Sequence, residues 1–244
     1  GQLDALAPSQ DAPTPHGRRQ DDARPGRLGA EQQLGGRGRQ GRVWHSAAGR
    51  SLTFSLALAL RPPSWSGLSL AVGVALADAL DPACGDAPAR IGLKWPNDLW
   101  LMDDARRGRK LGGVLIETVA VGDQRMTVVG VVLNVMPLPM GPELSSGFAC
   151  LQELWPEMDA PTALRQVALP LARALLLFEA KGFAAFADGY RRRDLLAGRQ
   201  VTTTFPGVPE GVAEGIDDTG ALRVRADSVH ALVSGEVSVR PVEA

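Results

Sequence analysis

The feature that most constrains the fold is a change of residue pattern near residue 195. Before it the chain carries long apolar runs, whereas after it the apolar residues fall into short pieces separated by turns such as Asp217-Asp-Thr-Gly220. Short β pieces at regular spacing are typical of a small all-β barrel. The pieces cover residues 200–205, 211–216, 221–226, 229–233 and 236–240. We therefore predict two domains, residues 1–194 and residues 195–244.

The first domain combines strand and helix patterns. Apolar residues alternate over 51–60, which predicts a strand buried mostly on one face, and the β-branched run 125–135 predicts a central strand. An apolar run of small residues over 68–80 and helical spacing over 162–180 predict two helices. The apolar-poor stretch 9–30 predicts a loop or an arm. These patterns indicate an α+β fold in which helices pack on a mixed β-sheet.

The charge balance and the cysteine content narrow the function classes. Twenty-six basic residues against 27 acidic ones give a net charge of −1, which predicts no general attraction to nucleic acid or to a membrane. No run reaches the roughly 18 apolar residues that a membrane helix needs. The two cysteines, Cys84 and Cys150, lie in no CxxC pair, which fits a reducing compartment. We expect a cytoplasmic protein.

Two short motifs hold most of the lysine in the chain. Only three lysines occur, and Lys94-Trp-Pro-Asn-Asp98 and Lys110-Leu-Gly-Gly113 contain two of them, while arginine supplies the other basic residues. Because the chain uses arginine almost everywhere else, lysine at these two places indicates chemistry that needs a compact ammonium group rather than the planar guanidinium of arginine. The competing interpretation is a surface turn followed by a loop lysine.

A third motif, Gly36-Arg-Gly-Arg-Gln-Gly-Arg42, precedes Trp44. Its glycines allow the backbone to approach a ligand closely, and its arginines supply donors for carboxylate or phosphate. A flexible linker and an RNA-binding arginine–glycine tract are the alternatives. The near-neutral charge balance disfavours the RNA-binding alternative.

Together the motifs resemble the biotin protein ligase family, also called biotin–acetyl-CoA-carboxylase ligases. The resemblance rests on Glu31-Gln-Gln33, residues 36–42 with Trp44 and Ser46, residues 94–98, residues 110–117, Asn134, residues 215–222 and residues 234–240. It covers about residue 28 to the C-terminus, and it implies a class II synthetase-like catalytic domain followed by a small SH3-like β-barrel. Because only eight residues precede Ser9, we expect the form without an N-terminal DNA-binding domain.

The resemblance implies an ATP-dependent ligase. Such an enzyme forms biotinyl-5′-AMP from biotin and ATP with Mg²⁺, then transfers biotin to one lysine of a biotin carboxyl carrier protein. The implied partner is the carrier domain of a biotin-dependent carboxylase, with no nucleic acid or membrane partner, and a homodimer is compatible with it. Two alternatives stay open: a degenerate, non-catalytic biotin-binding homologue and a lipoate-type ligase relative.

The family also implies which residues act. Lys110, Arg39 and Asp98 would be catalytic, with Lys110 between the biotin carboxylate and the α-phosphate and Asp98 near the acceptor amine. The implied biotin-binding residues are Ser9, Gln33, Arg37, Gly38, Arg39, Trp44, Lys110 and Gly113. The implied nucleotide-binding residues are Arg39, Arg42, Trp44, Asn97, Asp98, Lys110 and Asn134. No residue is expected to bind a metal ion directly.

Overall fold

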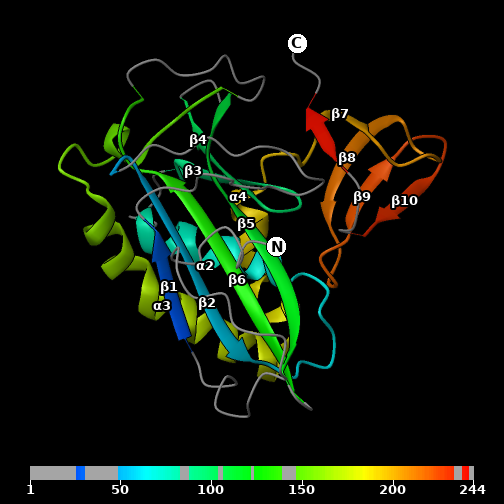
Figure 1. Cartoon of the computed structure of the whole chain (residues 1–244). Coiled ribbons are helices and arrows are strands. Elements are labelled where there is room, and N and C mark those ends of the chain that lie inside the picture. The colour runs from blue at the N-terminus through cyan, green and yellow to red at the C-terminus, as the bar shows by residue number, and fades with distance from the viewer. Residues whose placement is uncertain are drawn as a thin grey trace.

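A six-stranded sheet forms the centre of the first domain (Figure 1). The computed structural model describes residues 26–30, 49–82, 88–103, 107–121, 124–138, 147–233 and 238–241. The strands are β1 (Gly26–Ala30), β2 (Ser51–Ala59), β3 (Ile91–Lys94), β4 (Asp98–Met102), β5 (Gly108–Val121) and β6 (Gln124–Asn134). Their order across the sheet is β1-β2-β6-β5-β4-β3. We expected a mixed sheet, but every pairing between these described strands is antiparallel, and parallel contacts are isolated bridges.

The two predicted helices are confirmed as α2 (Leu68–Leu80) and α3 (Ala160–Lys181). Figure 1 shows both lying against the same face of the sheet. The amide of Thr162 donates 2.7 Å to the Asp159 side chain, which caps the start of α3. Pro170 lies inside α3. No described helix is long and apolar enough to cross a membrane.

Burial of the central strands is more complete than the sequence indicated. We expected β2 to be buried mostly on one face, but the five residues Ser51–Ser55 are all buried. Residues 126–134 of β6 are buried as well. The strand β6 lies between β2 and β5, which confirms the prediction of a central strand for this β-branched run.

The strand β1 corrects the predicted loop over residues 9–30. Gly26–Ala30 pairs with β2 as an antiparallel edge strand, and residues 1–25 lie outside the described part of the chain. An edge strand is held by main-chain hydrogen bonds along one side, so it needs few apolar side chains. Among its described side chains, Leu28 alone is half-buried, which is why the hydrophobic pattern gave no strand signal.

The second sheet belongs to the C-terminal domain and confirms the predicted small all-β unit. Its strands are β7 (Gln200–Thr203), β8 (Glu210–Ile216), β9 (Leu222–Arg225), β10 (Val229–Leu232) and β11 (Val239–Pro241). The order is β10-β9-β8-β7-β11, all antiparallel. Within the described residues β10 and β11 form the two edges, so main-chain pairing does not close this sheet into a full barrel.

The turn between β8 and β9 joins the two domains. The Trp95 indole N–H donates 3.1 Å to the carbonyl oxygen of Gly220, and the Ser66 hydroxyl donates 2.6 Å to that of Thr219. Arg191 pairs with Asp218 at 2.7 Å on the surface beside this contact. Trp95 is fully buried, so the domains share a packed and hydrogen-bonded boundary.

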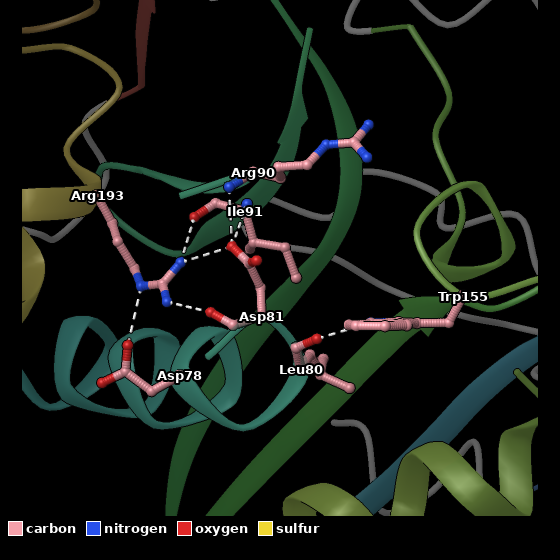
Figure 2. Close-up of polar contacts among 7 residues, drawn as sticks. All are labelled: Asp78, Leu80, Asp81, Arg90, Ile91, Trp155 and Arg193. Carbon is pink, nitrogen blue, oxygen red and sulfur yellow. Dashed lines mark hydrogen bonds and ion pairs between the residues drawn. The ribbon is translucent and has the colours of Figure 1, made fainter. Parts of the chain in front are cut away.

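A buried arginine fixes the short helix α4 (Ala187–Arg193) to the first domain (Figure 2). The Arg193 side chain is 3% exposed and pairs with Asp78 at 2.9 Å and with Asp81 at 3.0 Å, both from the end of α2. The same Asp81 carboxylate accepts the amides of Arg90 and Ile91 at the start of β3. One charged cluster thus holds α2, β3 and α4 together.

Candidate functional site

The two lysine motifs meet in an ion pair. The Lys110 ammonium Nζ lies 2.7 Å from Asp98 Oδ1, and the two side chains are 24% and 15% exposed. Asp98 begins β4 and Lys110 lies in β5, so the pair crosses neighbouring strands at one end of the sheet. Partial burial keeps water from screening this pair as it screens a surface pair. The pair leaves a cation beside a carboxylate that solvent and ligands can still reach.

Local backbone geometry sets this arrangement. The β4–β5 pairing shifts register between Leu99 and Trp100, so Trp100 opposes Lys110 whereas Asp98 opposes Gly113. A bulge of this kind re-aims the side chains on either side of it. The preceding turn contains a cis peptide bond between Trp95 and Pro96.

The side chain of Asn97 fastens this turn to β5. Its amide Nδ2 donates 2.8 Å to the carbonyl oxygen of Val114, and the amide of Val114 donates 2.9 Å back to the carbonyl oxygen of Asn97. The family resemblance implies contact of Asn97 with the nucleotide. In the structure its amide group holds the turn on which Asp98 stands.

Two adjacent glycines of β5 differ in what surrounds them. A Cβ on Gly113 would lie 3.4 Å from Asp98 Oδ1 and 3.9 Å from Lys110 Cε, so this glycine directly borders the ion pair. A Cβ on Gly112 would lie 2.4 Å from the carbonyl oxygen of Val132, a contact that forces the backbone to move. Gly113 stays a predicted site residue, and Gly112, which sequence reasoning did not single out, is the glycine that the pairing of β5 with β6 requires.

Asn134 ends β6 as a buried cross-link. Its Nδ2 donates 3.0 Å to the carbonyl oxygen of Ala149 and 3.3 Å to that of Lys110, and the residue is 5% exposed. The amide of Ala149 in turn donates 3.0 Å to the carbonyl oxygen of Lys110. Asn134 therefore supports the backbone of Lys110 rather than lying free at the surface.

Sequence reasoning missed a buried polar group behind Asp98. Residues that line one small cavity include Ser69, Asn97, Asp98 and Tyr190 of α4. Tyr190 is 1% exposed, and its hydroxyl has no hydrogen-bond partner among the described residues. Burial, with the charges of Asp194 and Asp98, raises the pKa of the Tyr190 phenol well above its ordinary value.

Asp194 lies four residues after Tyr190 and is also buried, at 6% exposed. Burial raises the pKa of its carboxyl to about 6, although the amides of Leu196 and Ala197 donate to it and oppose the shift. Its Oδ2 atom has no partner among the described residues. Neither residue belongs to a sequence motif, and 92 positions separate Tyr190 from Asp98, so no local pattern could have identified them.

The structure brings together Asn97, Asp98, Lys110, Gly113 and Asn134 of the predicted site. The other predicted site residues lie outside the described residues: Ser9, Gln33, Arg37, Gly38, Arg39, Arg42 and Trp44. The described half of the site combines an ammonium, a carboxylate and a glycine edge. Such a set can bind an anionic ligand and can orient an amine.

Two family profiles match the chain. The Biotin/lipoate A/B protein ligase family matches residues 17–134, and the Biotin protein ligase C terminal domain matches residues 197–240. Their order along the chain is the order of the two sheets. The first match covers the ion pair, and the second covers β7 to β10 together with most of β11.

Individual proteins agree. The chain is 35% identical to the bifunctional ligase/repressor BirA of Escherichia coli over 88% of its own length, although it spans only 66% of that protein. It is 34% identical to the biotin–acetyl-CoA-carboxylase ligase of Paracoccus denitrificans, with 80% of this chain and 82% of that protein covered. The corresponding ligase of Mycobacterium tuberculosis is 33% identical, with coverages of 79% and 70%.

A solved structure extends the likeness to three dimensions. The biotin protein ligase of Aquifex aeolicus in complex with biotin and ATP superposes with a TM-score of 0.73 at 28% identity, covering 88% of this chain and 89% of that one. Sequence identity, domain order and fold therefore lead to one conclusion: the chain belongs to the biotin protein ligase family.

Proposed function

We propose that this protein is an ATP-dependent ligase that forms biotinyl-5′-AMP from biotin and ATP and transfers biotin to one lysine of a biotin carboxyl carrier protein. The observation that carries the proposal is the Lys110–Asp98 pair at 2.7 Å, which joins the two motifs by which the chain resembles these ligases. The names of the relatives and the biotin and ATP of the Aquifex aeolicus complex support the same substrates.

In the first step a biotin carboxylate attacks the α-phosphate of ATP, and pyrophosphate leaves. Two anionic groups must come into contact, so a cation placed between them lowers the barrier. We assign this role to Lys110, because its ammonium lies on a rigid strand and is held by one carboxylate oxygen. The Mg²⁺ would enter with the polyphosphate as part of the substrate MgATP, since Asp98 already faces a lysine.

In the second step the carrier lysine attacks the mixed anhydride and AMP leaves. An ordinary lysine has a pKa of about 10.4, so removing its proton at pH 7 costs roughly 4.6 kcal/mol. A carboxylate beside the incoming amine orients it and accepts its proton as the bond forms. We assign that role to Asp98, which lies at the edge of the site with Gly113 beside it.

The remaining assignments follow the family resemblance. We propose that Ser9, Gln33, Arg37, Gly38 and Trp44 bind biotin, that Arg39 and Arg42 neutralise the phosphates, and that Asn97 and Asn134 border the nucleotide. For Asn97 and Asn134, the contacts with β5 support a role in holding Asp98 and Lys110 in place. We further propose a domain boundary after residue 194, a carboxylase carrier domain as partner and a cytoplasmic site of action.

One experiment tests the function. The protein is incubated with biotin, MgATP and a biotin carboxyl carrier domain, and the carrier mass and released pyrophosphate are measured. An increment of one biotin, lost when the carrier lysine is replaced by arginine, is the expected result. Biotin binding without pyrophosphate release would instead identify a non-catalytic homologue, and modification by lipoate but not by biotin would identify a lipoate-type ligase.

A further inference from the structure

The small cavity beside Asp98 has apolar and polar residues in its wall. The polar ones are Ser69 from α2, Lys94 at the end of β3, Asn97 and Asp98 from the turn before and the start of β4, and Tyr190 from α4. The Lys94 ammonium lies over the Trp100 ring, 5.7 Å from its centroid. Small polar cavities in proteins hold ordered water when two to four hydrogen-bonding groups face them.

Most of the polar groups in this wall already have partners. The Ser69 hydroxyl donates 2.9 Å to the carbonyl oxygen of Pro96, and the Asn97 amide donates to Val114. Asp98 uses Oδ1 to accept from Lys110, and among the described residues its Oδ2 makes no hydrogen bond. Asp98, whose second carboxylate oxygen has room for a hydrogen bond, and a buried donor therefore line the same cavity.

That donor is the Tyr190 hydroxyl, which is buried and unpartnered among the described residues. A buried hydroxyl without a partner is unfavourable, so such a group in a native protein calls for a water or a functional contact. The raised pKa of the phenol, which burial and the charges of Asp194 and Asp98 cause, keeps it protonated at neutral pH. The Tyr190 hydroxyl is then a donor that lines the same cavity as the Asp98 carboxylate.

We propose that Tyr190 is a positioning residue for Asp98: its hydroxyl donates to a water in this cavity, and that water donates to the Asp98 carboxylate. The water also has the lone pairs of the Ser69 hydroxyl within the same wall. Held from behind in this way, Asp98 keeps one oxygen on Lys110 and a fixed orientation toward the incoming amine. The effect on transfer rests on the proposed function of Asp98, whereas the contact itself does not.

A double-mutant cycle tests the functional part. Tyr190→Phe keeps the ring and removes only the hydroxyl. We expect it to lower kcat for transfer from preformed biotinyl-5′-AMP about tenfold with an unchanged KM for the carrier, because a misplaced catalytic group costs turnover rather than binding. In an Asp98→Asn background the same change should cost less than about twofold. Equal losses in both backgrounds, or no loss in the wild-type background, would overturn the proposal.

Thr127→Val is the matched control. It also removes a buried hydroxyl without a described partner, but from the far half of β6, opposite Leu58. We expect this variant to transfer biotin at the wild-type rate. If its kcat falls as much as that of Tyr190→Phe, the effect of Tyr190→Phe comes from the loss of a buried hydroxyl in general and not from a contact with Asp98.

A spectroscopic arm works even if the protein transfers no biotin. Tyr190 is the only tyrosine of the chain, so protein labelled with ¹³Cζ-tyrosine gives a single resonance that reports the hydrogen bond of its hydroxyl. Asp98→Asn should shift this resonance, whereas Asp188→Asn, which removes an exposed charge from the same helix, should leave it in place. A shift with Asp194→Asn and none with Asp98→Asn would assign the hydroxyl to Asp194 and sink the proposal.

Discussion

Asp194→Asn tests the cost of a buried carboxylate at the junction of the two domains. Burial raises the pKa of the Asp194 carboxyl from 3.8 to about 6, so folding makes its ionisation harder by about 2.2 units. At about 1.36 kcal/mol per unit, the ionised group lowers the free energy of unfolding by about 3 kcal/mol at neutral pH. Because the folded state binds the proton more tightly than the unfolded chain, the protonated Asp194 leaves the protein with its full free energy of unfolding below about pH 4. The protein loses about 3 kcal/mol as the pH rises through about 6.

The asparagine variant removes the pH dependence and keeps the acceptor for the Leu196 amide, which lies 2.8 Å from Oδ1. The asparagine NH₂ group takes the place of Asp194 Oδ2, which has no described partner, so it lowers the free energy of unfolding by an amount that does not vary with pH. We therefore expect the difference in unfolding free energy, variant minus wild type, to rise by about 2 kcal/mol between pH 4.5 and 7.5.

Urea unfolding followed by tryptophan fluorescence at a series of pH values measures this difference. Asp188→Asn serves as the control, because its side chain is 85% exposed and removal of its charge should produce no such slope. A variant whose advantage stays constant across the series would show that Asp194 ionises in the folded protein as easily as in the unfolded chain, and the reasoning from burial would be wrong.

Three further predictions, made with five substitutions, test the site and its supports. Lys110→Ala should abolish pyrophosphate release with little change in stability, and Lys110→Arg should restore it only in part, because a planar fork cannot replace a point charge; normal release by the alanine variant contradicts the assignment. Gly112→Ala should destabilise the fold by about 1–3 kcal/mol, whereas Gly113→Ala should fold normally; equal melting temperatures would contradict the packing argument. Arg193→Ala should cost about 3–5 kcal/mol, because it removes a buried guanidinium and leaves the half-buried Asp81 carboxylate without its charged partner, and a thermal melt close to wild type would show that the cluster contributes nothing.

The sequence predicted the elements that carry strong periodicity. The strands around 51–59 and 124–134 and the helices at 68–80 and 160–181 follow their apolar patterns closely. Both Asp98 and Lys110 were predicted as site residues, but the ion pair between them was not, although they lie 12 positions apart in the consecutive strands β4 and β5. The two residues were named because their motifs resemble the family's, and their pairing depends on how β4 lies against β5.

The parts that the sequence could not predict depend on contacts between distant segments. Arg193 is one of three consecutive arginines after Tyr190, but it is the only one of the three that is buried. It is buried because it pairs with Asp78 and Asp81, which lie more than 110 positions earlier in the chain. Nothing in a window of residues separates a buried arginine from two exposed neighbours. The register shift beside Leu99 could not be predicted from the sequence either, because a bulge depends on the partner strand.

The turn of residues 95–98 contacts the C-terminal domain, the helix α2, the strand β5 and Lys110. At its start the Trp95 indole binds the C-terminal domain through Gly220, and at its end Asp98 pairs with Lys110. Between them, Asn97 is tied to β5 and the carbonyl of Pro96 accepts from Ser69 of α2. A change in Trp95 therefore disturbs the domain boundary and the carboxylate together, because four residues carry both. Loss of activity in a Trp95 variant would not identify a ligand contact of that indole, whereas Tyr190→Phe changes one hydroxyl of a residue in the cavity that Asp98 also lines and removes no group of the Trp95–Gly220 contact.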